Sequence, residues 1–335
     1  MPLLFDKRPT VASPALSPAQ DECEHSGQIE LTIGLINNMP DSALKATERQ
    51  FMRLLRTAAG STPIRFHCFS LPSVTRSPSA QCHVDRDYTD IAELDHLRFD
   101  GLIVTGAEPN ALNLPEEPFW QELTGIIDWA QNHTRSTIFS CLAAHAAVLH
   151  LDGIERQRLG TKCSGVYDCA KLRDDWLTRD LPARIKVPHS RFNALSADQL
   201  AARGYRVLTS SDEAGVDIFA RRHNSHFIFL QGHPEYDASS LQREYMRDLA
   251  RFLSGERDLY PAIPAGYFDA ATEQHLMDFE RRARIDRDPM LAAELPGLML
   301  RPDVPAGSTA TILLRNWLGF LGEEARADQL ADRRE

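Results

Sequence analysis

The sequence predicts an α/β fold, in which helices flank a mostly parallel sheet that carries antiparallel additions and a C-terminal helical extension. In residues 29–150, short apolar segments of strand length alternate with amphipathic helical segments. This alternation is typical of parallel strands joined by right-handed helical crossovers. After residue 150, short strands follow one another with turn residues between them, which indicates antiparallel pairing.

The first half of the chain pairs each buried strand with a following helix. In the first helix Leu44, Phe51 and Leu55 recur at roughly helical spacing and define one apolar face. Residues 73–87 are polar, and we expect them to form a loop over a site. The expected strands are residues 29–37, 64–71, 99–107 and 136–141, and the expected helices are residues 42–58, 90–97, 119–132 and 142–149.

The second half is expected to contain shorter strands and two helices. Residues 239–254 form a helix with Leu241, Tyr245 and Leu249 at apolar positions. Residues 255–310 are proline-rich and mixed in charge, and an apolar helix over 309–322 closes the chain. The expected strands are residues 164–167, 184–187, 205–211, 215–220 and 226–230.

A length of 335 residues allows one large or two modest domains. Residues 1–27 are rich in proline, serine and charge and lack an apolar signal core, which predicts a flexible leader. We expect residues 28–255 to form the main domain and residues 256–335 to form a C-terminal extension packed on that same domain.

Composition and charge exclude several classes of partner. The net charge is −10 and there is no basic stripe, so we expect no nucleic acid partner. The apolar runs are far shorter than a membrane span requires, so we expect no membrane association. The six cysteines lack the spacing of a metal site or a disulfide scaffold, which predicts no metal and reduced thiols in the cytoplasm.

Cys141 stands where a predicted buried strand runs directly into an alanine-rich helix. A cysteine at such a junction lies at the positive end of the helix dipole, which favours the thiolate. The surrounding small residues permit a tight elbow, as in other nucleophile turns. A cysteine in an apolar run is more often a small core residue, but the elbow context favours a nucleophile here.

A second polar motif follows the strand predicted over residues 226–230. His233 and Glu235 are separated by a single proline in this motif. A cysteine, a distant histidine and a carboxylate two residues further supply the nucleophile, base and orienting group that acyl transfer through a thioester needs. The residues alone therefore predict a cysteine-dependent acyl-transfer site built from Cys141, His233 and Glu235.

Several specific motifs occur in order along the chain, from about residue 30 to residue 320. The most specific blocks are Ser164-Gly165-Val166-Tyr167, Pro188-His189-Ser190-Arg191 and Gly232-His233-Pro234-Glu235-Tyr236-Asp237. Further motifs are Met39-Pro40, Thr47-Glu48, residues 99–107, Cys141, Lys162-Cys163, residues 244–248 and Asn316-Trp317-Leu318. Together these motifs resemble the homoserine O-succinyltransferase/O-acetyltransferase family.

This resemblance implies a class I glutamine-amidotransferase-like, flavodoxin-like fold. It also implies an enzyme that acylates the side-chain hydroxyl of L-homoserine for methionine biosynthesis. The acyl donor is succinyl-CoA or acetyl-CoA as a co-substrate, there is no tightly bound cofactor, and the family expectation is a homodimer. Two displacements through one covalent intermediate imply ping-pong kinetics.

The same resemblance assigns residue roles. Cys141 accepts the acyl group, His233 is the general base and Glu235 orients it, while Arg247 clamps the carboxylate of the amino acid, as a guanidinium does well. The further substrate-binding residues are Lys162, Ser190, Asn110 and Lys45. We expect the oxyanion to be met by the backbone N–H groups of Leu142 and Ala107.

Four positions in three segments depart from the family pattern. Asp41 and Ser42 stand where the family carries a lysine pair, and Lys45 is the nearby lysine. Asn110 stands where glutamate accompanies acetyl donors and glycine succinyl donors. Because an asparagine amide can donate a hydrogen bond to a distal carboxylate and does not repel it, we expect succinyl-CoA to be preferred. Leu142 replaces a tryptophan that often follows the nucleophile.

Alternative functions from other classes share these residues. A glutamine amidotransferase or cysteine hydrolase uses the same cysteine, histidine and glutamate, and a glutaminase assay would identify it. A related acyltransferase could act on another hydroxy amino acid such as serine. A non-catalytic amino-acid-binding relative is disfavoured because Cys141, His233 and Glu235 are all present.

Overall fold

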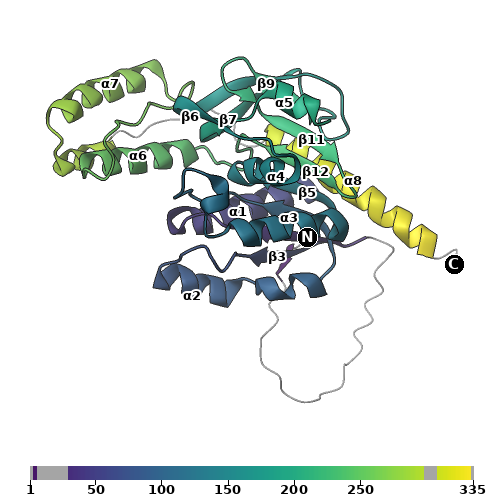
Figure 1. The fold of residues 1–335 in the computed structure, drawn as a ribbon. Helices are drawn as coiled ribbons and strands as arrows, with labels where there is room; N and C mark the ends of the chain where they lie inside the picture. The colour runs from purple at the N-terminus through teal and green to yellow at the C-terminus, as the bar shows by residue number, and fades with distance from the viewer. Residues whose placement is uncertain (1–2, 6–28, 298–307, 333–335) are drawn as a thin grey trace. The chain divides into compact units, whose positions relative to one another are not determined.

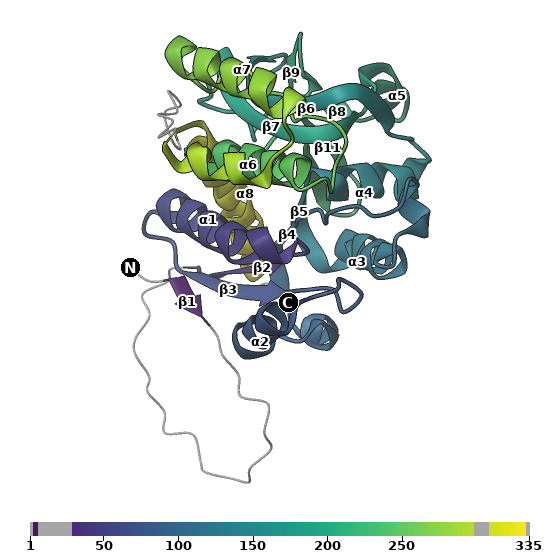
Figure 2. The same ribbon diagram turned by 90° about the vertical axis from the view of Figure 1, so that its left-hand side faces the viewer.

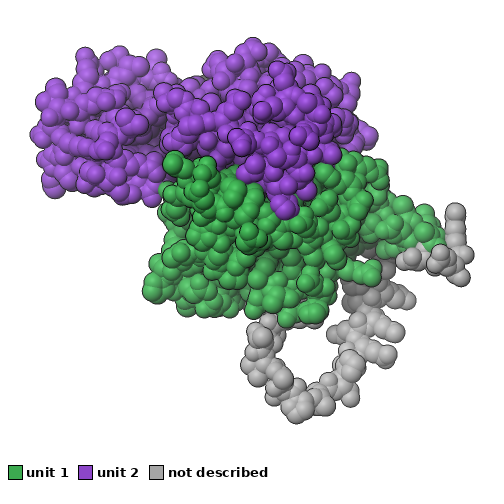
Figure 3. Space-filling view, viewed as in Figure 1, with its two compact units in different colours: residues 1–139, 222–227, 314–335 green, residues 140–221, 228–313 purple. Residues whose placement is uncertain are grey.

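The computed structural model describes residues 3–5, 29–297 and 308–332. Two compact units are distinguished by colour in Figure 3. The first unit comprises residues 1–139, 222–227 and 314–335, and the second comprises residues 140–221 and 228–313. Each unit is therefore assembled from segments that lie far apart in the sequence.

The first unit is built on a parallel sheet whose strand order is β1-β3-β2-β4-β5. In Figure 2 the strands β3, β2, β4 and β5 lie side by side. Most of their side chains are buried, as expected for parallel strands covered on both faces. The strands are β1 (Leu3–Phe5), β2 (Leu31–Ile36), β3 (Ile64–Phe69), β4 (Phe99–Val104) and β5 (Thr134–Ser140).

The last helix, α8 (Ser308–Asp332), covers one face of this sheet and is yellow in Figure 1. Trp317 is fully buried and its Nε1 donates a hydrogen bond of 2.9 Å to Ser136 Oγ on β5. The other helices of the unit are α1 (Asp41–Ala59), α2 (Pro78–Asp87), η1 (Ile91–His96), η2 (Leu114–Glu116) and α3 (Trp120–His133).

The second unit contains an antiparallel sheet of order β10-β9-β6-β7. Its strands are β6 (Gln157–Lys171), β7 (Arg184–Ala194), β9 (Thr209–Ser211) and β10 (Gly215–Val216). β6 and β7 pair along most of their length, and Ala265 forms a bridge to Gly165 of β6. The segment after residue 255 is thereby held against this sheet by backbone hydrogen bonds.

The second unit contains further helices and strands, which precede, separate or follow the strands of that sheet along the chain. α6 (Ser240–Leu253) and α7 (Ala270–Ile285) share an apolar cluster that includes Tyr245, Leu249 and Phe279. The remaining elements are α4 (Leu142–Asp152), α5 (Ala197–Ala202), β8 (Arg206–Val207), η3 (Pro289–Gly297) and most of β11 (Ile218–Arg222) and β12 (His226–Leu230).

The α/β prediction is confirmed, including the antiparallel additions and the C-terminal helix. Three α-helices were not expected, and the shortest of them is the six-residue α5 (Ala197–Ala202). Residues 78–87 form α2 rather than part of a loop, because Ser77 caps its N-terminus and Pro78 occupies the first turn. α7 was missed as well, although Asp269 caps it by accepting a 2.7 Å hydrogen bond from the Thr272 amide.

Most of the expected leader, residues 6–28, lies outside the described residues, while residues 3–5 form β1 and pair with β3. The partition into residues 28–255 and 256–335 stays a prediction. In the parts of the chain that the structure describes, no helix has the length and apolar character needed to cross a membrane.

Gly101 on β4 offers a test of how α8 docks. A Cβ atom at this position would lie 2.6 Å from Trp317 Cζ2 and 2.7 Å from Leu321 Cδ1. We expect Gly101→Ala to lower the free energy of unfolding by about 1–3 kcal/mol through overpacking. Gly125→Ala is the matched control, since its Cβ meets open space on an exposed helix position, and it should stabilise by about 0.4–1 kcal/mol. Urea unfolding of both variants decides; equal effects would contradict the proposed packing.

Candidate active site

Cys141 lies between the end of β5 and the start of α4, in a backbone conformation that is rare outside glycine. Its φ is 53° and its ψ is −111°. The Cys141 amide donates a 2.7 Å hydrogen bond to the carbonyl of Leu230, the last residue of β12. The residue is half-buried and directly precedes the first turn of α4, whose Ala144 amide donates a 3.0 Å hydrogen bond to Cys141 O. The predicted elbow is therefore present.

His233 follows β12 and is held by its backbone and its ring. Its amide donates a 2.7 Å hydrogen bond to Pro188 O on β7. Its Nδ1 lies 2.8 Å from Glu235 Oε1, and the Tyr236 ring stacks on the imidazole with a centroid separation of 4.3 Å. Both His233 and Glu235 are buried. The ring is thereby fixed in position on two sides.

Charge compensation explains how His233 can carry a proton although it is buried. Burial by itself lowers the pKa of this imidazole. The negative charges of Glu235 and of the Cys141 thiolate, together with side-chain hydrogen bonds to both, outweigh burial and raise the pKa of His233 well above its usual value. The three predicted residues are thus brought together, with the His233 imidazole in contact with both Cys141 and Glu235. Such an arrangement is suited to acyl transfer through a covalent thioester.

The predicted substrate-binding residues Lys162, Ser190 and Arg247 lie in the same unit and converge on two carboxylates of α6. Lys162 Nζ is 2.8 Å from Asp248 Oδ2 and 3.6 Å from Glu244 Oε2. Arg247 Nη2 is 3.1 Å from Asp248 Oδ1, and the Ser190 hydroxyl donates to Glu244. The cationic groups that would meet a substrate carboxylate are therefore already neutralised by partners on α6.

Glu244 and Asp248 keep their charge despite this burial. Burial raises the pKa of Glu244, but Lys162 and the hydroxyl groups of Ser190 and Tyr236 outweigh it and lower that pKa overall. Burial likewise raises the pKa of Asp248, and Lys162 and Arg247 outweigh it. The sequence motifs predicted no role for either carboxylate or for Tyr236. The signal available was the i, i+4 spacing of Glu244 and Asp248, which places both on one helix face.

The other predicted site residues are distributed as follows. Leu142 is the first residue of α4, directly after Cys141. Lys45 is exposed on α1, and Ala107 and Asn110 follow β4, with Asn110 exposed. These last three belong to the first unit, and their roles stay predictions.

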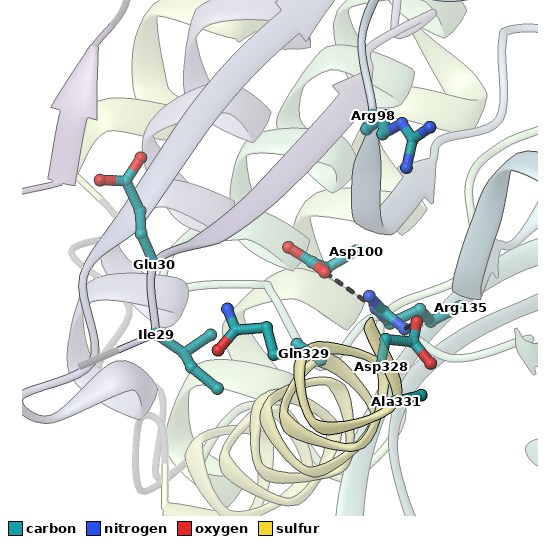
Figure 4. A pocket seen from close by; sticks show the side chains of 9 residues that line it. Ile29, Glu30, Arg98, Asp100, Arg135, Asp328, Gln329 and Ala331 are labelled. Atoms are coloured by element: carbon teal, nitrogen blue, oxygen red, sulfur yellow. Dashed lines mark hydrogen bonds and ion pairs between the residues drawn. The ribbon is translucent and has the colours of Figure 1, made fainter. Parts of the chain in front are cut away.

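The first unit contains a cavity of about 340 Å³ near the amino ends of β2, β4 and β5. Figure 4 shows Arg135 lying between Asp100 and Asp328 in this cavity, at 2.9 Å and 2.5 Å respectively. These ion pairs join α8 to β4 and β5. None of the predicted site residues lines this cavity, so its charges serve the docking of α8.

The comparisons with known proteins agree with the sequence motifs. The profile of the family described as homoserine O-succinyltransferase matches residues 10–325. The chain belongs to the homoserine O-succinyltransferase family. Among its relatives, the homoserine O-succinyltransferase of Bradyrhizobium japonicum is 61% identical over 96% of this chain and 100% of its own length. The same-named protein of Rhodopseudomonas palustris is 56% identical over 97% of this chain and all of its own.

Among solved structures, a glutamine amidotransferase from Thermotoga maritima is similar over 88% of this chain and 98% of its own, with 14% identity and a TM-score of 0.48. The family resemblance expected from the motifs is confirmed by the profile and the relatives. In a homoserine O-succinyltransferase family member, Cys141, His233 and Glu235 thus occupy one compact site.

The strain at Cys141 can be measured. Because glycine tolerates positive φ, Cys141→Gly should relieve strain of about 1–3 kcal/mol. The greater unfolded-state freedom of glycine opposes this by about 0.4–1 kcal/mol. We therefore expect Cys141→Gly to be about 1 kcal/mol more stable than the control Cys141→Ala in urea unfolding. A Cys141→Ala protein of equal or greater stability would argue against a strained elbow.

Proposed function

We propose that this protein transfers a succinyl group from succinyl-CoA to the side-chain hydroxyl of L-homoserine, in the cytoplasm and within methionine biosynthesis. The observation that carries the proposal is the contact of His233 with both Cys141 and Glu235, in a chain of this family. The printed names of the relatives support homoserine as acceptor and succinyl as the group transferred. Assembly as a homodimer belongs to the same proposal.

The first half-reaction forms the acyl-enzyme. The Cys141 thiolate attacks the thioester carbonyl, and the oxyanion is met by the backbone N–H groups of Leu142 and Ala107. Collapse of the tetrahedral intermediate breaks the bond to the CoA sulfur. His233, charged at this stage because Glu235 and Cys141 raise its pKa, gives its proton to the departing CoA thiolate. The products are free CoA and a thioester on Cys141.

The second half-reaction uses the same groups in reverse. Homoserine binds with its carboxylate near Arg247 and Lys162, displacing part of their pairing with Glu244 and Asp248. Neutral His233 accepts the hydroxyl proton as that oxygen attacks the thioester, while Glu235 holds the ring by its 2.8 Å contact to Nδ1. Release of the Cys141 thiolate restores the starting thiolate–imidazolium pair.

Intact-mass analysis after mixing with succinyl-CoA tests this scheme. The wild-type protein should gain one succinyl group that neutral hydroxylamine removes and that L-homoserine discharges. Cys141→Ala should gain none and should lose several orders of magnitude in turnover. Cys82→Ser is the matched control, because Cys82 is the exposed thiol among the described cysteines and would react non-specifically. Turnover of a folded Cys141→Ala protein would contradict the covalent route, and release of ammonia from glutamine would favour an amidotransferase.

Asn110 is proposed to select the acyl donor. Asn110→Glu should shift the kcat/KM ratio from succinyl-CoA towards acetyl-CoA by on the order of 1–3 kcal/mol, because the new carboxylate repels the distal carboxylate of the succinyl group. Asn113→Glu, which adds the same charge at another exposed position of this loop, is the control. An unchanged ratio in Asn110→Glu, or a wild type that prefers acetyl-CoA, would refute the role of Asn110.

A further inference from the structure

Asp217 is a buried carboxylate that lies between β10 and β11 and has no role in the chemistry above. It is 1% exposed. Its Oδ2 accepts a 2.8 Å hydrogen bond from Thr209 Oγ1, and the carboxylate also accepts from the Gly232 amide and the Cys169 thiol. Burial raises the pKa of Asp217 to about 6, and these hydrogen bonds together with Arg191 limit the rise. Burying such a group is costly unless it is fully hydrogen-bonded, as it is here.

The three consecutive amides of residues 231–233, which lead to the general base, all donate hydrogen bonds to Asp217 or Pro188. The Gln231 amide donates to Asp217 O at 2.9 Å, the Gly232 amide donates to the Asp217 carboxylate, and the His233 amide donates to Pro188 O at 2.7 Å. Asp217 therefore fixes two of the three peptide groups that set the position of the His233 Cα atom.

Gly232 shows how closely the chain approaches Asp217. A Cβ atom on residue 232 would lie 2.7 Å from Asp217 Oδ1 and 2.4 Å from Val187 Cγ1. Contacts this short do not occur for real side chains, so the segment lies directly against the carboxylate. A small displacement of Asp217 would move the backbone of the residue that precedes His233.

The same segment is connected to the helix that carries the nucleophile. Gln231 Nε2 donates a 2.7 Å hydrogen bond to Val216 O, which leaves Gln231 Oε1 as the acceptor for His145 Nε2 at 3.1 Å. Burial, with the charge of Arg191 nearby, lowers the pKa of His145 to about 3, so the ring is neutral and donates from Nε2. His145 lies one turn after Cys141 on α4. Asp217 and Val216 therefore support the segment that leads to the base and, through Gln231, the helix that carries the nucleophile.

A metal site is the competing interpretation of this cluster. One potential ligand atom each of Cys169, His189 and Asp217 lies within 4.8 Å of the others. However, the oxygens of Asp217 are already occupied by Thr209, Gly232 and Cys169 as donors. His189 Nε2 remains 3.5 Å from Asp217 Oδ1. A metal ion would have to displace the hydrogen bond to Gly232, so the present donor set favours a hydrogen-bonded support.

We propose that Asp217 is a positioning residue for the reaction: its carboxylate holds the Gly232 amide and thereby sets the distance between the His233 imidazole and the Cys141 thiol. The inference rests on the proposed function for the role of His233 as the base. Displacement of a catalytic group by about 1 Å can lower a rate by roughly 10²-fold. The contribution of Asp217 thus lies in kcat rather than in substrate affinity.

Asp217→Leu and Asp217→Asn separate the hydrogen bond from the charge. Leucine has similar bulk and no acceptor, whereas the asparagine oxygen can still accept from the Gly232 amide. We expect Asp217→Leu to lower kcat for succinyl transfer about 100-fold with KM changed less than about threefold. Asp217→Asn should remain within about tenfold of the wild type. The rate of Cys141 alkylation by iodoacetamide at pH 7 should fall about tenfold in Asp217→Leu, because a displaced imidazolium no longer stabilises the thiolate.

Asp152→Leu is the matched control, because Asp152 is also a paired aspartate of this unit, bound to Arg221 and to the Tyr205 hydroxyl. It should lower Tm without changing kcat or the alkylation rate per folded molecule. A folded Asp217→Leu protein with wild-type kcat and alkylation rate would overturn the proposal, as would stoichiometric zinc in the purified protein that Asp217→Leu abolishes.

If Asp217→Leu does not fold, Asp217→Asn decides. A folded Asn variant within tenfold of wild type supports the hydrogen-bonding role, and a loss beyond a hundredfold overturns it. The alkylation measurement needs no substrate. Absence of succinyl transfer by the wild type would therefore reject the proposed function, while a dependence of Cys141 alkylation on Asp217 would still support positioning.

Discussion

The site depends on the hydrogen bond from the Cys141 amide to Leu230 O, because this bond joins the two chain segments that supply the thiol and the imidazole. Leu230 ends β12, and His233 follows three residues later. Cys141 meets this bond with a φ of 53°, which costs on the order of 1–3 kcal/mol. The tightly buried helix α4, whose Ala143 and Ala144 are fully inaccessible, offsets that strain. The elbow is thus maintained by packing behind it.

Electrostatics impose a second constraint, since a buried charge is tolerated only with its partners in place. The raised pKa of His233 depends on its neighbours Glu235 and Cys141, whose charges and hydrogen bonds outweigh its burial. The cation Lys162 requires Asp248 and Glu244 in the same way. Removing one member of either group leaves the others uncompensated, so single substitutions should cost more than their individual contacts suggest. Under the proposed function, a substrate carboxylate that binds Lys162 and Arg247 replaces part of their present pairing.

The sequence was sufficient for the parts of the molecule that are encoded locally. β12 begins and ends at the predicted residues, and the Cys141 elbow follows from a strand running into an alanine-rich helix. α2 and α7 were missed because their polar, weakly amphipathic segments are defined mainly by caps. The contacts of Glu244 with Ser190 and Lys162 could not be predicted, because they join residues 54 and 82 positions apart. No local pattern records which buried groups will pair across such separations.

The departure at Asp41 has a physical explanation in the first unit. Arg76 is a buried guanidinium, with 2% of its side chain exposed, that donates to the carbonyls of Asn37 and Met39. Asp41 Oδ1 lies 3.5 Å from Arg76 Nη1, and Asp41 Oδ2 accepts a 2.8 Å hydrogen bond from the Ser77 amide.

A lysine at position 41 would face Arg76 as a like charge and leave the Ser77 amide without this acceptor. The acidic residue is therefore coupled to Arg76, and in this chain it stabilises the segment after β2 instead of presenting a cation. Lys45, on the exposed side of α1, is the lysine that this helix offers.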